Sequence, residues 1–154
     1  APTALGEIRH LKARMERERI PRGTDRRRNL KLGPGGLSDI EFTVQITQLL
    51  HGHRNPTLRV TNTTDALDAA RDAGIISESD ASRFAAAYSF LTRLRNRLFL
   101  LVGRPVDALP DRAEDLEALG VSMGYNEQPR QELEEEYLRH TRRVRRAAEP
   151  IIYG

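Results

Sequence analysis

The sequence contains no cysteine, so neither disulfide bonds nor thiolate metal sites are possible. It also lacks tryptophan, and only 5% of its residues are aromatic. The longest apolar run, "LFLLV" at residues 98–102, is much shorter than the roughly 20 residues that a transmembrane helix needs. The first residues carry charges from Glu7 onward and show no signal-peptide pattern. We therefore expect a cytoplasmic protein that does not contact a membrane.

The chain has 154 residues, of which 38% are hydrophobic and 31% charged. This length suffices for one domain that buries roughly 70% of the surface of its unfolded chain. The first residue is Ala1 rather than methionine, which is expected of a processed protein or of a piece of a longer one. We expect a single helical domain over residues 1–154. Residues 1–36 would form a first helix and an Arg/Gly-rich loop, and residues 37–154 the main bundle.

The net charge of +3 is small, but the basic residues are unevenly distributed. Between Arg9 and Lys31 there are ten basic and only three acidic residues, and a second basic run, "RHTRRVRR", lies at residues 139–146. Two interpretations stay open. These residues could be the solvated faces of helices, or they could attract a polyanion or a phosphate group.

Apolar residues recur at helical spacing along most of the chain. Thr3 can cap a first helix that ends near Arg19, and Phe84, Leu91 and Leu98 recur every seven residues in the longest predicted helix, residues 78–102. No segment alternates with the period of a strand. The pattern predicts an all-α, antiparallel (up-and-down) four-helix-type bundle with extra short helices.

Several helix ends have recognisable capping signals. Ser38 and Glu41 match a capping box, flanked by Leu37 and Phe42 at the hydrophobic-staple positions. The same reasoning predicts caps at two short helices and a distortion or end of the last helix; the residues concerned are Thr64, Asp111 with Glu114, and Pro150.

Neither a metal site nor a catalytic group is expected in this chain. Asp39 and Glu41 are spaced like a magnesium-binding carboxylate pair, but on a helix residues two apart diverge by about 200°, so helix-start electrostatics is favoured. His51 and His53 flank a glycine that reads as a helix cap, which makes a metal site there improbable. His140, within a basic helix, is expected to face solvent.

The loop before the predicted start at Ser38 could serve as an anion site. Gly35 and Gly36 permit close approach of backbone N–H groups at the positive end of a helix. Lys31 and the run Arg26–Arg28 add cationic side chains. A sharp structural turn explains the same glycines, and both interpretations remain open at this point.

The stretch "KLGPGGLSDIEFTVQ" closely resembles a motif in the helical domain of bacterial glutamine synthetase adenylyltransferases, which are bifunctional adenylyl-transferring and adenylyl-removing enzymes. The matching residues are Lys31, Leu32, Gly35, Gly36, Leu37, Asp39, Ile40, Glu41, Phe42 and Gln45. The likeness continues through "HGHRNPTLRVTNTTDAL", "AAAYSFLTRLRNRLFLL" and "YLRHTRRVRR". Asp39 before Ile-Glu-Phe is more typical of the second of the family's two bundles, which implies the C-terminal, adenylylating half.

The resemblance implies that the chemistry belongs to a nucleotidyltransferase domain upstream of this chain. That domain would use ATP and Mg²⁺ to transfer AMP to a tyrosine of glutamine synthetase and would remove it by phosphorolysis, as part of nitrogen regulation. No cofactor is expected to bind this chain alone. We expect the residues near the nucleotide or its phosphates to be Lys31, Gly35, Gly36, Ser38, Asp39 and Glu41.

Two other functions remain as alternatives. The bundle could be an interaction module that docks glutamine synthetase or a PII signal protein. A nucleic-acid-binding helical domain is less favoured, because the net charge is modest and no basic strip interleaved with aromatic residues is present.

Overall fold

The computed structural model describes residues 3–154, and within them it is helical without any β-strand. Its α-helices are α1 (Ala4–Arg19), α2 (Leu37–His51), α3 (Thr63–Asp72), α4 (Glu78–Val102), α5 (Ala113–Ser122) and α6 (Pro129–Tyr153). Short 3₁₀ turns, η1 (Arg26–Arg28) and η2 (Pro56–Leu58), lie in two of the connections. This confirms the predicted all-α fold.

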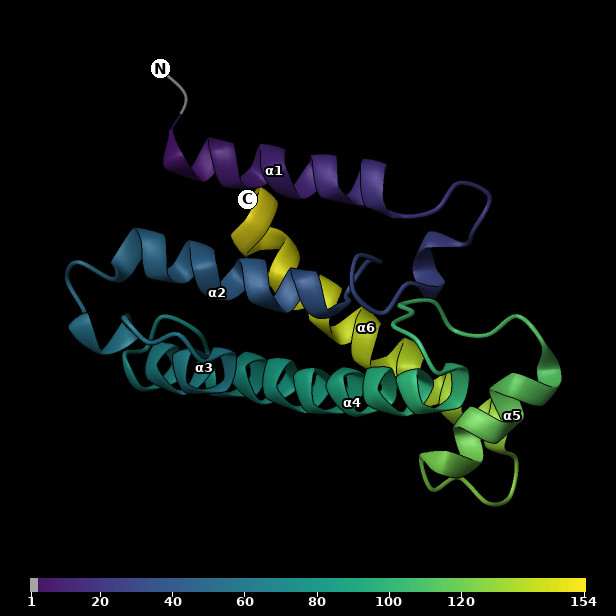
Figure 1. The fold of residues 1–154 in the computed structure, drawn as a ribbon. Coiled ribbons are helices and arrows are strands. Elements are labelled where there is room, and N and C mark those ends of the chain that lie inside the picture. The colour runs from purple at the N-terminus through teal and green to yellow at the C-terminus, as the bar shows by residue number, and fades with distance from the viewer. Residues whose placement is uncertain (1–2) are drawn as a thin grey trace.

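The four longer helices α1, α2, α4 and α6 alternate in direction (Figure 1). Helix α6 crosses behind α2 and α4 and contacts both of them, while α1 contacts α2 along one side. The short helix α5 contacts α6 and the end of α4. The predicted four-helix-type bundle with added short helices is therefore confirmed.

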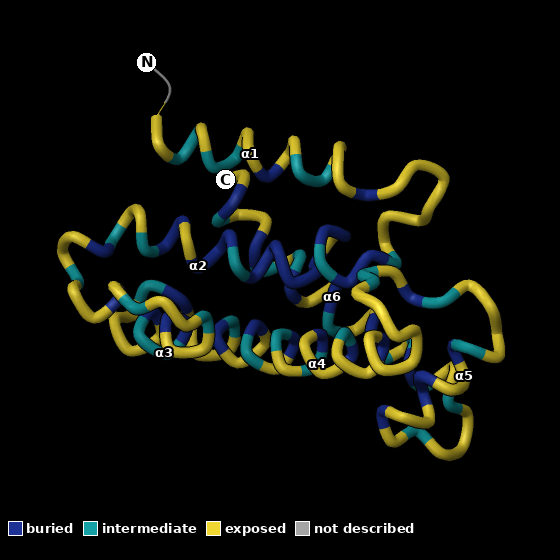
Figure 2. The backbone as a smooth tube through the Cα atoms, viewed as in Figure 1, coloured by how far each residue is buried: buried dark blue, intermediate teal, exposed yellow. Residues whose placement is uncertain are grey.

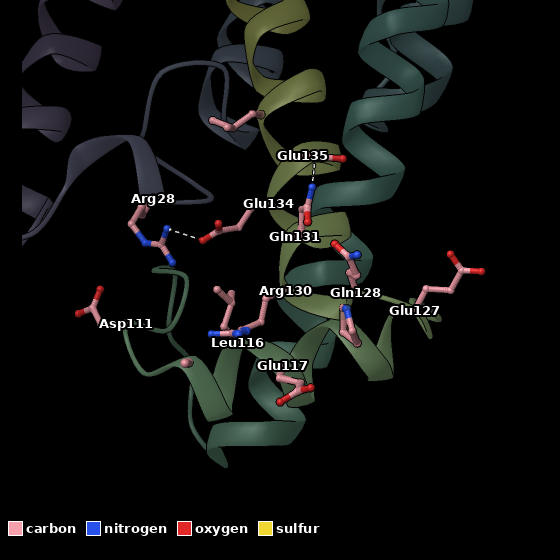
Figure 3. Close-up of a pocket in the computed structure, with 13 residues that line it drawn as sticks. Arg28, Asp111, Leu116, Glu117, Glu127, Gln128, Arg130, Gln131, Glu134 and Glu135 are labelled. Carbon is pink, nitrogen blue, oxygen red and sulfur yellow. Dashed lines mark hydrogen bonds and ion pairs between the residues drawn. The ribbon is translucent and has the colours of Figure 1, made fainter.

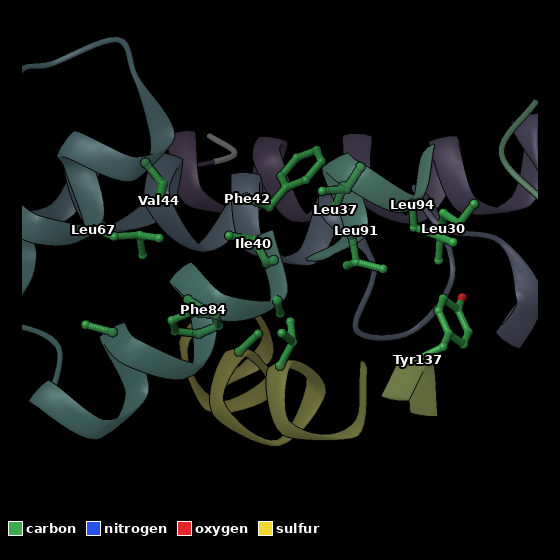
Figure 4. Packing of buried hydrophobic residues seen from close by; sticks show 14 of the residues in the cluster. Leu30, Leu37, Ile40, Phe42, Val44, Leu67, Phe84, Leu91, Leu94 and Tyr137 are labelled. Carbon is green, nitrogen blue, oxygen red and sulfur yellow. The ribbon is translucent and has the colours of Figure 1, made fainter. Parts of the chain in front are cut away.

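One continuous apolar core lies between α2, α4 and α6 (Figure 2). On α4 the seven-residue repeat Phe84, Leu91 and Leu98 is buried, as predicted. Figure 4 shows Phe84 and Leu91 of this row near Ile40 of α2 and other residues of the cluster. Helix α6 completes the core with Leu133, Tyr137, Val144, Ala148 and Ile152.

The boundaries of α1 match those read from the sequence. The Thr3 hydroxyl accepts a hydrogen bond from the N–H of Gly6 at 3.0 Å, which makes Thr3 the expected N-cap. The helix ends at Ile20, whose backbone is extended before Pro21, because the residue before a proline avoids the helical conformation.

The predicted capping box of α2 is wrong. The N-cap is Gly36, and Ser38 lies inside the first turn, where it is buried. Glu41 is therefore not the partner of a capping serine. Carbonyl groups of the preceding loop accept the first N–H groups of this helix instead, so the helix can begin before Ser38.

Three other local predictions are also corrected. Asn62, rather than Thr64, caps α3 by accepting from the N–H of Asp65 at 3.2 Å. Helix α5 begins after Arg112, which makes no capping hydrogen bond, so Asp111 and Glu114 form no capping box. Helix α6 continues through Pro150 to Tyr153, since a proline near a helix end removes only one of the last N–H donors.

No helix in residues 3–154 is both long enough and apolar enough to cross a membrane.

Candidate functional site

The Gly-rich loop between η1 and α2 is closed by its own hydrogen bonds. The side-chain oxygen of Asn29 accepts from the N–H groups of Lys31 and Leu32 at 3.1 and 2.8 Å. The carbonyl groups of Leu30 and Lys31 accept from the N–H groups of the first two residues of α2, at 2.9 and 2.8 Å. The amides at the start of α2 are thus already paired within the protein, and the side chains are what this region can offer to a ligand.

The two glycines allow this loop to pack closely on neighbouring backbone. Gly35 has a φ of +75°, and a Cβ there would lie 1.8 Å from the carbonyl oxygen of Thr141 on α6. A Cβ on Gly36 would lie 2.6 Å from the carbonyl oxygen of Leu30. The chain requires glycine at both positions because any side chain would collide with backbone.

An ionic cluster around a buried carboxylate, the Asp39 cluster, fixes the start of α2 to α1 and α6. It consists of Lys12, Glu16, Asp39 and Arg145. Asp39 is fully buried and lies 2.6 Å from Lys12 Nζ and 3.2 Å from Arg145 Nη1. Its Oδ2 also accepts from the N–H of Gly35 at 2.6 Å. Asp39 therefore binds protein groups on three sides and has no free face for a metal ion.

Lys12 is the unusual member of the Asp39 cluster because only 1% of it is exposed. Burial alone would lower the pKa of Lys12, but its contacts with Asp39 and Glu16 outweigh burial and raise that pKa above the ordinary value. The ammonium group also lies 5.8 Å from the ring centres of Phe42 and Tyr153, where the π faces attract a cation. Lys12 is thus a charged residue of the core.

The position of Lys12 in the sequence already indicates that it is buried, although the apolar residues of α1 alone do not reveal this. Lys12 stands four residues after Ile8 and three before Met15, so it lies on the apolar face of α1. Leu11, its neighbour, is instead 41% exposed. A lysine on a buried helix face requires an acidic partner, and here that partner is Asp39.

The outward surface of this region carries a second group of polar side chains, the Glu41 face, made of Lys31, Glu41, Gln45 and Arg95. Glu41 is half-buried, and burial raises its pKa, while the charges of Lys31 and Arg95 act in the opposite direction. Gln45 is exposed one helical turn after Glu41. The face thus combines two cations, one carboxylate and one amide.

Arg95 was not predicted from the sequence as a site residue. It comes from the middle of α4, and its Nε donates to Oδ1 of Asp107 at 2.7 Å. The carbonyl of Asp107 accepts from the N–H of Leu30 at 2.6 Å. The connection between α4 and α5 therefore ties Arg95 to the loop that carries Lys31.

The structure divides the six predicted site residues into two groups. Lys31 and Glu41 lie together on the partly exposed Glu41 face. The other four are buried behind that face; they are Gly35, Gly36, Ser38 and Asp39. The buried group supports the exposed group, and the exposed group is what can meet another molecule.

A cavity of about 920 Å³ lies elsewhere, between α5, α6 and η1 (Figure 3). Arg28 donates to Glu134 at 3.1 Å and to the carbonyl of Pro110 at 2.8 Å. Acidic residues outnumber basic ones in its lining; they are Asp111, Glu117, Glu127, Glu134 and Glu135, against Arg28 and Arg130. Such a lining disfavours a phosphate-bearing ligand.

In the part of the chain that the structure describes, no three His, Asp or Glu side chains gather in a way that could hold a metal ion. His53 is exposed after the end of α2, and His51 is partly buried within it. The expectation for His140 is wrong: its ring stacks on Phe90 with centroids 4.7 Å apart, and burial lowers its pKa. The histidines of the described residues therefore lie apart from any cluster of acidic side chains.

Comparison with known proteins gives consistent matches. The family model described as GlnD PII-uridylyltransferase matches residues 9–152. Proteins named bifunctional glutamine synthetase adenylyltransferase/adenylyl-removing enzyme are similar over nearly the whole chain. The one from Cutibacterium acnes is 48% identical over 97% of this chain, and the one from Streptomyces coelicolor is 47% identical over 98%.

A third such relative, from Mycobacterium avium, is 42% identical over 99% of the chain. In each of these three comparisons the chain spans only 15% of the length of the relative. Because the family model covers almost all of the described helices, the chain belongs to the GlnD PII-uridylyltransferase family, and within it resembles a region of the glutamine synthetase adenylyltransferases.

Proposed function

We propose that this chain is a helical domain, residues 1–154, of a bifunctional glutamine synthetase adenylyltransferase/adenylyl-removing enzyme of the cytoplasm. The observation that carries the proposal is the 42–48% identity, over nearly the whole chain, to proteins of that name. A nucleotidyltransferase domain that precedes it would transfer AMP from ATP to a tyrosine of glutamine synthetase and remove it by phosphorolysis. Asp39 before Ile-Glu-Phe favours the C-terminal, adenylylating half.

In this proposal the helical domain supports catalysis without performing it. ATP and Mg²⁺ would bind to the catalytic domain, because the described residues of this chain offer no ligand set for a metal. When bound there, Mg²⁺ would neutralise the phosphate charges during AMP transfer. The chain itself contributes the Glu41 face, which would lie against the catalytic domain and form one wall of the nucleotide site.

The Glu41 face has the chemistry for this role. Lys31 is a mobile point charge that can meet a phosphate oxygen, and the planar guanidinium of Arg95 can donate two hydrogen bonds at once. Glu41 and Gln45 can accept from ribose hydroxyl groups. The buried Asp39, Gly35 and Gly36 hold the loop so that Lys31 stays beside Glu41.

A second candidate function is an interaction module for glutamine synthetase or a PII signal protein. The observation that favours it is the exposed apolar end of α4, where Phe99, Leu100, Leu101 and Val102 are 42–72% exposed. Contiguous exposed apolar side chains often mark a protein contact. This function can coexist with the first, since Phe99 lies only one helical turn beyond Arg95.

The deciding experiment is AMP transfer to glutamine synthetase by the full-length enzyme carrying Lys31→Ala. We expect unchanged thermal stability and a roughly ten- to hundred-fold loss of kcat/KM, since a charge-assisted contact contributes about 1.5–3 kcal/mol. Arg17→Ala, on the exposed side of α1, is the matched control and should behave like the wild type.

Wild-type kinetics of Lys31→Ala would remove the Glu41 face from the nucleotide site. An assay with UTP and PII protein tests the reaction named in the family description. Uridylyl transfer without adenylyl transfer would contradict the proposed function itself.

A further inference from the structure

A groove between the start of α4 and the middle of α6 gathers arginine side chains. Its volume is about 530 Å³, which lies within the range of small-molecule sites. Five of its lining residues are arginines and two are acidic: Arg83, Arg139, Arg142, Arg143 and Arg146, with Asp80 and Glu135. We call it the arginine groove.

The spacing along α6 explains why the guanidinium groups converge. Arg142 and Arg143 lie three and four residues after Arg139, and Arg146 lies four and three residues after them, so the four side chains lie on one broad face over two helical turns. Arg83 reaches the same space from α4. Like charges at this spacing destabilise an isolated helix, and an anion between them would remove that repulsion.

The arginines of the groove differ in how far the protein itself neutralises them. Arg83 pairs with Asp80 at 3.3 Å, and Arg139 pairs with Glu136. Within residues 3–154 no carboxylate pairs with Arg142, Arg143 or Arg146, and all three are exposed. The groove therefore presents three unneutralised guanidinium groups around one concave space.

We propose that the arginine groove binds a small polyphosphate-bearing anion. Five arginines against two carboxylates leave an excess of three positive charges in the lining, which two phosphate groups of about −1.5 to −2 charges each would balance. Guanidinium groups bind phosphate oxygens through paired hydrogen bonds. The site is separate from the Glu41 face and does not depend on the proposed function.

The test is calorimetric titration of the 154-residue chain with inorganic tripolyphosphate at low ionic strength. We compare the wild type with Arg142→Gln/Arg146→Gln and with the control Arg14→Gln/Arg17→Gln, which removes the same charge from the exposed side of α1. The groove variant should bind at least about tenfold more weakly. The control should stay within about twofold of the wild type.

Two results would overturn the proposal. The first is that the wild type does not bind, or that the control loses as much affinity as the groove variant. An equal loss of affinity would show that net charge alone attracts the anion. The second comes from a parallel titration with an oligoglutamate of equal charge. If it binds as tightly through the same arginines, the groove recognises an acidic protein segment rather than phosphate. Circular dichroism of each variant establishes that the helices are intact.

Discussion

Helix α6 carries arginines of two kinds within five residues, and the comparison shows how position on a helix decides their role. Arg145 points inward to the buried carboxylate of Asp39 at 3.2 Å. Arg142, Arg143 and Arg146 are exposed and line the arginine groove. The same residue type thus stabilises the tertiary structure where its guanidinium reaches a buried carboxylate, and is free to bind a ligand where it stays in water.

The first way to break this comparison is to remove the buried anion. Asp39→Asn would leave Lys12 buried without its main partner and Arg145 without its carboxylate. Breaking a buried ion pair on one side typically costs about 3–5 kcal/mol, and we expect a loss of that size in urea unfolding. Asp68→Asn, whose carboxylate pairs with Arg71 at the surface, should change stability by less than about 1 kcal/mol. Equal effects of the two substitutions would contradict the role given to the Asp39 cluster.

The second substitution separates backbone strain from the contact with α6. Gly35 and Gly74 have nearly the same φ, +75° and +73°, but only at Gly35 would a Cβ meet other atoms, those of Thr141. Gly74→Ala should cost about 1–2 kcal/mol, the usual penalty of the left-handed conformation. Gly35→Ala should cost at least about 2 kcal/mol more, because the loop before α2 and helix α6 must move apart to admit the methyl group. If Gly35→Ala and Gly74→Ala unfolded at the same midpoint, the loop before α2 would not be packed on α6.

The third comparison tests where α2 starts. Because Ser38 lies within the first turn and caps nothing, Ser38→Ala should cost less than about 0.5 kcal/mol. Asn62→Ala, which removes the N-cap of α3, should cost about 1 kcal/mol. Thermal unfolding of both variants measures the difference. A larger loss for Ser38→Ala than for Asn62→Ala would restore serine as the cap.

The smallest effect concerns His140 of α6, which is partly buried beside the arginine groove. Burial lowers the pKa of His140, and the charges of Arg139 and Arg143 lower it further. A lowered pKa in the folded state means that stability is present above the ordinary value of 6.5 and is lost as pH falls below it. Arg143→Gln should raise the pKa of His140 and weaken this loss.

The measurement is an NMR titration of the His140 ring, with Arg17→Gln as the control for net charge. Tripolyphosphate should move the His140 pKa in the same direction as Arg143→Gln, because both reduce the positive charge beside the ring. If Arg17→Gln raised the pKa of His140 by as much as Arg143→Gln does, the effect would come from net charge and would not be local.

Much of the fold could be predicted from the sequence because it depends on local rules. Apolar spacing located α4 to within a residue, and Thr3 caps α1 as predicted. These features need only neighbours three or four residues away. The start of α2 could not be predicted this way, since its cap comes from carbonyl groups of a loop closed by Asn29.

The candidate site shows the same division. The motif from Lys31 to Gln45 pointed to this region and to the family. It did not show that Asp39 is buried and that Glu41 is partly exposed, nor that Arg95 joins Lys31 and Glu41 from α4. Side chains separated by dozens of residues meet only after the helices pack.

The sequence by itself determined the helices, the seam of the bundle and the resemblance to the adenylyltransferase family, since these depend on residue types and their spacing. Only the tertiary structure decided which charges are buried and which are available. Lys12, Asp39 and Arg145 come from three helices, and the attraction of each cation to the Asp39 carboxylate is strong only where packing removes water. Arg142, Arg143 and Arg146 of α6 instead remain exposed to water, and for that reason they are free to bind an anion.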